Sequence, residues 1–153
     1  MEIGTKYGSL QQFIESDGCI EDYGPDMFSI DEIQKIAILD LRILNLDRNS
    51  ENILVKTVFT KKGLKKRVLI PIDHGLSLSA NFEICSFDIC WFEYSQVQEK
   101  FSDRAMRYIR SIDIMKDIEM LDQTFKIRPI CLRNFRIANT LLKKGVEGGL
   151  TMH

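Results

Sequence analysis

Three polar residues in this sequence have the types and the spacing of a site for a metal ion and phosphate. Asp47 is followed five residues later by Asn52, and Asp73 begins the triplet Asp-His-Gly. An amide carbonyl and a carboxylate are hard oxygen ligands, which suit a Mg²⁺ ion that also holds phosphate groups. We therefore predict that Asn52 and Asp73 bind Mg²⁺ together with a phosphorylated substrate.

Asp47 could act on the substrate that Asn52 and Asp73 are predicted to bind. Its place on the loop before Asn52 allows its carboxylate to orient a hydroxyl nucleophile or to accept the hydroxyl proton. In kinases a loop Asp, a metal-binding Asn and the Asp of a D-x-G triplet share the work of phosphoryl transfer in this way. Gly75 would let the backbone turn tightly beneath the phosphates. Each motif alone is typical of caps and turns, so the prediction rests on their order along the chain.

Two β-rich runs explain how Asn52 and Asp73 could meet. Residues 53–59 and 68–72 are rich in Val, Ile and Leu, and the basic segment 61–66 between them contains Gly63. This pattern predicts a β-hairpin with an exposed, positive tip. A hairpin brings its outer ends together, so Asn52 and Asp73 would face one point. The lysines of the tip are expected to be solvated, with contact to anionic lipid as the alternative.

Helices are expected to position this hairpin. Ser29 and Glu32 have the S-x-x-E spacing of a capping box, and the apolar residues that follow predict a buried helix to about Leu44. Gly145 is expected to end the last helix. The layout predicts one domain with an α+β fold that is mostly helical. Further helices are expected over residues 102–112, 114–125 and 131–144.

Composition narrows the class of protein. The 153 residues are 44% hydrophobic and 28% charged, with a formal net charge of −1, so the whole chain has no strong attraction to nucleic acid. Two histidines and four cysteines without a C-x-x-C pair argue against a zinc site and for reduced thiols. We find no signal peptide and no apolar run of membrane-spanning length. We therefore expect a cytoplasmic protein whose membrane contact is peripheral. The cysteines are Cys19, Cys85, Cys90 and Cys131.

Long stretches of the sequence resemble one enzyme family. Residues 36–55 are similar to the catalytic-loop region of type II and plant gamma-type phosphatidylinositol 4-kinases, and residues 69–78 resemble their metal-binding segment. The gamma type also reads D-H-G in that segment. Residues 6–14 are similar to the family's hinge strand, and residues 141–147 to its closing helix.

The resemblance implies a role for each site residue. Asp47 would be the catalytic aspartate, with Arg48 as a supporting catalytic-loop residue, and Asn52 and Asp73 would be the magnesium ligands. The implied reaction transfers the γ-phosphate of ATP to the 4-hydroxyl of phosphatidylinositol in membranes, mostly by positioning and charge neutralisation.

The resemblance also implies a domain organisation. Residues 1–27 would form a hinge strand and loop, with Gln12 and Ile14 bordering the adenine of ATP. Residues 28–153 would form the C-terminal lobe of a protein-kinase-like catalytic domain, with the catalytic-loop β-hairpin. Because the sequence has no counterpart of the N-terminal lobe and its phosphate-binding lysine, we expect weak nucleotide binding. We also expect pairing with an N-terminal lobe or another chain through exposed apolar side chains, namely Leu10, Phe13 and Ile14.

The sequence departs from the family in two places. Asn49 stands where many relatives have a histidine. Residues 91–97 replace an aromatic run with W-P-Q-A that lies near the membrane side in relatives, and here Ser95 stands in place of the proline. Core packing is the alternative expectation for the aromatic residues of this segment, which are Trp91, Phe92 and Tyr94.

Other classes of protein stay open. A catalytically inactive kinase C-terminal lobe could serve as a binding module, and retention of Asp47, Asn52 and Asp73 together argues against that alternative. A protein kinase is disfavoured because Arg48 follows Asp47, where protein kinases have arginine before the aspartate, and because no A-P-E-like segment follows. An unrelated α+β fold is disfavoured by the extent of the match.

Overall fold

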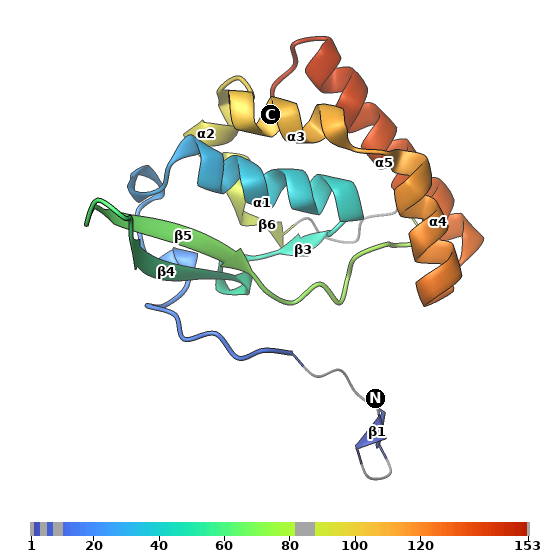
Figure 1. The fold of residues 1–153 in the computed structure, drawn as a ribbon, viewed down its shortest axis with the longest axis horizontal. Helices are drawn as coiled ribbons and strands as arrows, with labels where there is room; N and C mark the ends of the chain where they lie inside the picture. Colours follow the sequence, from blue (N-terminus) through green and yellow to red (C-terminus); the bar gives the residue numbers. More distant parts are fainter. Residues whose placement is uncertain (1, 4–5, 8–10, 82–87, 153) are drawn as a thin grey trace.

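A single central helix organises the fold. The computed structural model describes residues 2–3, 6–7, 11–81 and 88–152, so Leu10, Cys85 and the Phe87 side chain lie outside the described part of the chain. Helix α1 (Ile30–Ile43) lies between a β-hairpin on one side and the remaining helices on the other (Figure 1). This arrangement is a mixed α+β fold with more residues in helices than in strands.

Helix α1 owes its central place to an apolar stripe that covers much of its surface. Ile33, Ile36 and Ala37 have almost no exposed surface. The helix ends at Leu44 in the left-handed conformation, close to the predicted end. The predicted capping box is wrong, because the Ser29 side chain makes no capping hydrogen bond and Glu32 is instead turned towards the hairpin.

The hairpin consists of strands β4 (Ile53–Phe59) and β5 (Lys65–Pro71), which pair antiparallel with Ile53 opposite Pro71 and Val55 opposite Leu69. The apolar side chains of Ile53, Val55 and Leu69 are buried in the core that contains α1. Strand β5 begins earlier than the sequence pattern suggested. Lys66 therefore belongs to the strand, where it bonds to Glu32, and is not part of a solvated tip.

Each outer edge of the hairpin is hydrogen-bonded to another segment of the chain. On the β4 side, Val55 N donates to Gly18 O at 2.9 Å and Val55 O accepts from Asp17 N at 2.8 Å. On the β5 side, Leu69 N donates to the Glu32 carboxylate at 3.0 Å, and Lys35 Nζ donates to Leu69 O at 2.8 Å. At Val55 and Leu69, backbone groups that would otherwise be free for pairing with another chain are thus satisfied internally.

The later helices enclose the other face of α1. The expected spans agree with α3 (Asp103–Ser111), capped by Ser102, and with α4 (Ile114–Phe125). Helix α5 (Pro129–Glu147) runs through Gly145, so the predicted end is wrong. Val146 is buried in the core, and the turn out of the helix comes at Gly149, which has φ 74°. No helix in the described ranges is long and apolar enough to cross a bilayer.

Short elements complete the chain. They are β1 (Glu2–Ile3), β2 (Lys6–Tyr7), β3 (Asp47–Arg48), β6 (Asp88–Ile89), α2 (Ser95–Gln98) and the 3-10 turns Ile20–Asp22, Pro25–Met27, Ser50–Asn52 and Cys90–Glu93. Strand β3 pairs with β6 in parallel, which places the loop after α1 beside the segment that leads to Trp91.

We predict that Glu32→Gln lowers the free energy of unfolding by about 1–3 kcal/mol at pH 7, because it removes the charge that joins α1 to β5. Burial raises the pKa of Glu32, but Lys35, the Leu69 N–H and Lys66 more than offset burial, so the pKa lies below its usual 4.5. The stabilisation by ionised Glu32 is fully present above pH 4.5, its usual pKa. It is lost as the pH falls through the lowered pKa of Glu32 in the folded state.

Urea denaturation from pH 7 to pH 3 measures the effect. The difference between wild type and Glu32→Gln should shrink at the acidic end. The exposed Glu51 has no recorded partner in the described ranges, so Glu51→Gln is the control and should match wild type. If the difference in free energy of unfolding between wild type and Glu32→Gln stays constant with pH, the stabilisation does not come from the ionised Glu32.

Candidate active site

A buried ion pair lies beneath the predicted site residues. Arg48 on β3 is 0% exposed and Asp40 on α1 is 2% exposed. The Arg48 Nε atom lies 3.1 and 3.0 Å from the two Asp40 carboxylate oxygens, and Nη2 lies 2.9 Å from Oδ1. Trp91 Nε1 donates to Asp40 Oδ2 at 2.9 Å, and Asn45 Nδ2 donates to Oδ1 at 3.2 Å. Both charges are therefore paired and hydrogen-bonded, as buried charges must be.

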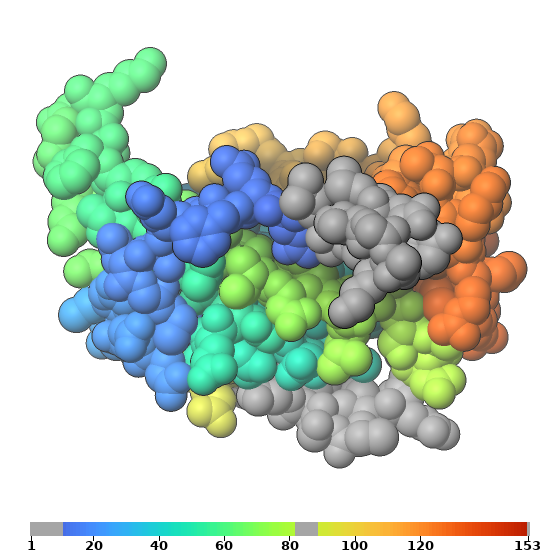
Figure 2. All heavy atoms as spheres, turned by 90° about the horizontal axis from the view of Figure 1, so that it is seen from below, coloured from blue at the N-terminus to red at the C-terminus, as the bar shows by residue number. Residues whose placement is uncertain are grey.

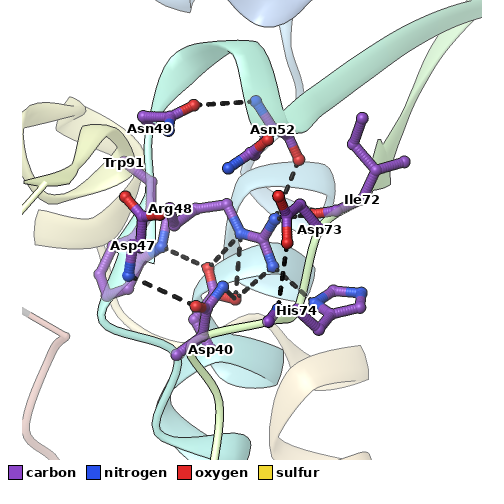
Figure 3. Close-up of polar contacts among 11 residues, drawn as sticks. Asp40, Asp47, Arg48, Asn49, Asn52, Ile72, Asp73, His74 and Trp91 are labelled. Carbon is purple, nitrogen blue, oxygen red and sulfur yellow. Dashed lines mark hydrogen bonds and ion pairs between the residues drawn. The ribbon is translucent and has the colours of Figure 1, made fainter.

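The other side of the Arg48 guanidinium joins the residue before β4 to the residue after β5. Its Nη1 atom donates to Asn52 O at 2.9 Å and also to Ile72 O. The backbone closes the same point, since Ile72 N donates to Asn52 O at 3.0 Å. The close-up in Figure 3 shows Arg48 between Asp40 on one side and the Asn52 and Ile72 carbonyls on the other. Arg48 thereby holds the residues just before Asp73 against Asn52.

The last N–H of Arg48 fixes the protonation of His74. Arg48 Nη2 lies 3.0 Å from His74 Nδ1. A guanidinium can only donate, so Nδ1 must accept and the proton of the neutral ring sits on Nε2. Burial and the nearby Arg48 charge lower the pKa of His74. All five N–H groups of Arg48 thus have partners, and none is free to contact a substrate.

Asp73 is held in an unusual backbone conformation. Its φ is 48°, in the left-handed region that Asp tolerates better than most residues. Its side-chain Oδ1 accepts the Gly75 N–H at 3.1 Å. A Cβ atom at position 75 would lie 3.2 Å from that oxygen, so glycine leaves room for the Asp73 carboxylate. Asp73 itself is exposed, with its second oxygen available to a ligand.

The chain after Asp73 is fastened to the helices. Leu78 N donates to Ile43 O at the end of α1, at 2.7 Å. The fully buried Asn134 on α5 donates through Nδ2 to Ser79 O and Ala80 O, at 3.1 and 2.9 Å. Backbone on both sides of the Asp-His-Gly triplet is therefore fixed.

The structure brings Asn52 and Asp73 to the same end of the hairpin, while Asp47 lies on strand β3. Asn52 N donates to Asn49 Oδ1 at 3.1 Å, while its own side-chain amide makes no hydrogen bond within the described residues. Asp47 is partly exposed on β3, and its N–H donates to Asn45 Oδ1 at 3.4 Å. Asn45 also contacts Asp40, so the same buried cluster fixes the Asp47 backbone.

Gln12 and Ile14 stand apart from this cluster. They belong to residues 11–16, which form no regular element and extend below the body in Figure 1. Gln12 is exposed and Ile14 partly exposed, while Phe13 between them is 87% exposed. Figure 2 shows the N-terminal segment in blue on the same face as the residues that follow β5. The predicted adenine contacts stay a prediction.

The aromatic segment divides between core and surface. Trp91 is 2% exposed, in agreement with core packing, and also carries a polar function by binding Asp40. Phe92 is half exposed. Tyr94 is partly buried, and this burial, together with Cys90, raises its pKa to about 12.

Sequence reasoning missed Asp40 and the role of His74. A signal for Asp40 was present, because it follows Ile36 and Ala37 at helical spacing and so falls on the buried stripe of α1. An acid on an apolar stripe requires a buried partner. The identity of that partner depends on tertiary structure.

The free oxygen ligands at this end of the hairpin suit a hard cation only in combination with a substrate. The described residues contain no group of three or more His, Cys, Asp or Glu side chains that could hold a metal ion by themselves. Asn52 and Asp73 offer two oxygen atoms, and Mg²⁺ takes its remaining ligands from phosphates and water in such sites.

We predict that Asp40→Asn lowers the free energy of unfolding by about 3–5 kcal/mol, because it leaves the buried Arg48 charge without its partner. Asp47→Asn should change stability by less than about 1 kcal/mol, since Asp47 is partly exposed and forms no ion pair in the described part of the chain. Guanidinium or thermal unfolding of the two variants compares the same chemical change at neighbouring sites. Equal losses of stability would contradict the assignment of Asp40, and not Asp47, as the partner of the buried Arg48 charge.

Comparison with known proteins gives a consistent result. All of residues 1–153 match the family described as phosphatidylinositol 3- and 4-kinase. The chain is 45% identical over 150 residues to phosphatidylinositol 4-kinase gamma 4 of Arabidopsis thaliana, covering 97% of this chain and 25% of that protein. It is 46% identical over 148 residues to phosphatidylinositol 4-kinase gamma 4 of Oryza sativa subsp. japonica, covering 96% of this chain and 25% of that protein. The chain thus spans about a quarter of the length of these relatives.

Proposed function

Since this chain belongs to the phosphatidylinositol 3- and 4-kinase family of enzymes, we propose that its residues take part in transferring the γ-phosphate of ATP to the 4-hydroxyl of phosphatidylinositol. The names of its plant relatives support this choice of substrate. The observation that carries the proposal is the closure of the hairpin by Arg48, which fixes Asn52 beside the Asp73 segment.

Asn52 and Asp73 are the proposed ligands of Mg²⁺. The Asn52 side-chain amide makes no hydrogen bond in the described part of the chain, and Asp73 has one carboxylate oxygen free of the Gly75 N–H. These donors fit the ion, which when bound would neutralise charge on the ATP phosphates. The left-handed conformation of Asp73 is a local cost of the kind often found at functional sites.

Asp47 is the proposed base. As the inositol hydroxyl oxygen bonds to the γ-phosphorus, its proton passes to the Asp47 carboxylate, and the bond from the γ-phosphorus to the bridging oxygen breaks to release ADP. Arg48 acts as a positioning residue in this scheme, because every one of its N–H groups is already bonded within the protein.

We propose further that residues 28–153 form the C-terminal lobe of the catalytic domain and residues 1–27 the hinge strand and loop, with Gln12 and Ile14 near the adenine. A complete ATP site then needs a second lobe, and the exposed Phe13 is a contact point for it. The reaction would take place in the cytoplasm, at a membrane surface that carries the lipid.

We predict that this chain binds Mg²⁺–ATP weakly and that Asp73→Asn weakens binding at least about tenfold, or 1.4 kcal/mol. Asparagine tolerates the positive φ at this position, so the change removes charge without forcing a new backbone. Titration calorimetry with Mg²⁺–ATP, and with ATP and EDTA, measures the effect.

Glu51→Gln removes a charge next to Asn52 without touching the proposed ligands and should bind like wild type. Equal weakening in both variants would indicate a general charge effect, and the absence of Mg²⁺–ATP binding by wild type would favour an inactive binding module. Equal weakening would overturn the proposed roles of Asn52 and Asp73.

A further inference from the structure

The tip of the hairpin projects from the body of the protein. Figure 2 shows the green residues at the end of β4 and β5 standing out from the rest of the surface. The turn is well ordered by its own hydrogen bonds: Thr60 N donates to Leu64 O at 2.9 Å, Gly63 N to Thr60 O at 2.8 Å, and Leu64 N to Thr60 Oγ1 at 3.1 Å. Gly63 has φ 75°, which glycine adopts without strain.

This tip exposes two large apolar side chains. Phe59 is 73% exposed and Leu64 is 64% exposed. Phe59 lies on the same face of β4 as Ile53 and Val55, since side chains alternate along a strand. Those two residues are fully buried, whereas Phe59 continues the apolar face out to the projecting tip, where its side chain is largely uncovered.

The same tip is positively charged. Residues 56–66 contain five lysines and no acidic residue. Acidic groups from neighbouring elements face only its base: Glu32 binds Lys66, and Asp17 accepts from Thr57 N at 2.6 Å near Lys56 and Lys65. Lys61 and Lys62 lie on the turn and form no ion pair within the described residues.

We propose that this tip, defined by Phe59, Lys61, Lys62 and Leu64, docks onto the surface of an anionic lipid bilayer. A bilayer interface satisfies both kinds of group at once, because apolar side chains enter the boundary of the acyl chains while lysines remain among the anionic headgroups. Nucleic acid would engage the lysines but leave Phe59 and Leu64 in water.

The docking surface deepens the proposed function, since a lipid kinase must meet its substrate at a membrane. It is nevertheless physically separate from the proposed catalytic residues. The tip is at one end of the hairpin and Asn52 and Asp73 are at the other, a separation of roughly 20 Å for strands of this length. Tip variants should therefore leave Mg²⁺–ATP binding unchanged.

Vesicle co-sedimentation tests the inference. The wild-type chain should bind vesicles of phosphatidylcholine with phosphatidylserine at least about tenfold more tightly than vesicles of phosphatidylcholine alone, and added salt should weaken this binding. Each lysine near an anionic surface contributes about fivefold in affinity, so the double variant K61E/K62E should lose at least about 25-fold. The variant F59S/L64S should also lose affinity, including at high salt, where electrostatic attraction is screened.

The control is K100E/K116E, which makes the same change of charge at exposed lysines in the loop after α2 and on α4. It should bind vesicles nearly as wild type does. Each of three results would overturn the proposal. The first is an equal loss of vesicle affinity in K61E/K62E and the control, and the second is equal binding of wild type to both vesicle types. The third is full vesicle binding by F59S/L64S. Displacement of the protein from vesicles by an oligonucleotide, with F59S/L64S binding that oligonucleotide like wild type, would instead assign the tip to a polyanion.

Calorimetry with Mg²⁺–ATP separates this inference from the proposed catalytic function. Vesicle binding that needs the tip, in a protein whose Mg²⁺–ATP affinity is unchanged by Asp73→Asn, would retain the docking surface and refute the proposed role of Asp73. If nucleotide binding depends on Asp73 but the protein does not bind vesicles, the proposed role of Asp73 is retained and the docking surface is refuted. Thermal unfolding of each variant confirms that the exposed substitutions leave the fold intact.

Discussion

The ion pair between Asp40 and Arg48 connects the central helix to the residues that flank the two strands of the hairpin. Asp40 comes from the central helix, Arg48 from strand β3, and the guanidinium contacts the residue before β4 and the residue after β5. Trp91 and Asn45 complete the shell around the carboxylate. Two charges in a nearly dry interior are costly to bury, and they are kept together here by a full set of hydrogen bonds. This arrangement fixes the geometry of the backbone at Asn52 and Ile72.

The buried, hydrogen-bonded Arg48 therefore holds the backbone beside the partly exposed side chain of Asn52 and the exposed side chain of Asp73. Arg48 uses all its donors within the protein, and His74 is held as a neutral ring by one of them. Asp73 and Asn52 keep free oxygen atoms towards solvent, while backbone on either side is fastened. Preorganised groups of this kind support phosphoryl transfer because little rearrangement is needed when charge develops.

Sequence patterns predicted the parts of this structure that depend on local spacing. The apolar stripe located α1, and the two β-rich runs located strands whose outer ends bring Asn52 to the Asp73 segment. The patterns failed where a distant partner decides the outcome. Glu32 has the spacing of a capping-box residue, yet its carboxylate accepts the Leu69 N–H of β5. Gly145 is a residue type that often ends helices, yet it lies inside α5. Asp40 could be marked as an acid on a buried stripe, but its pairing with Arg48 and Trp91 is visible only in three dimensions.

Arg48 supports the proposed site by holding Asn52 and Ile72 together through its planar fork of donors. The substitution Arg48→Lys keeps the positive charge for Asp40 but cannot reach two carbonyls, a carboxylate and His74 together. The most direct measurement is the affinity of folded Arg48→Lys for Mg²⁺–ATP by titration calorimetry, beside wild type. We expect a loss of at least about tenfold, or 1.4 kcal/mol, in a protein that still unfolds cooperatively. An affinity equal to that of wild type would contradict this role of Arg48.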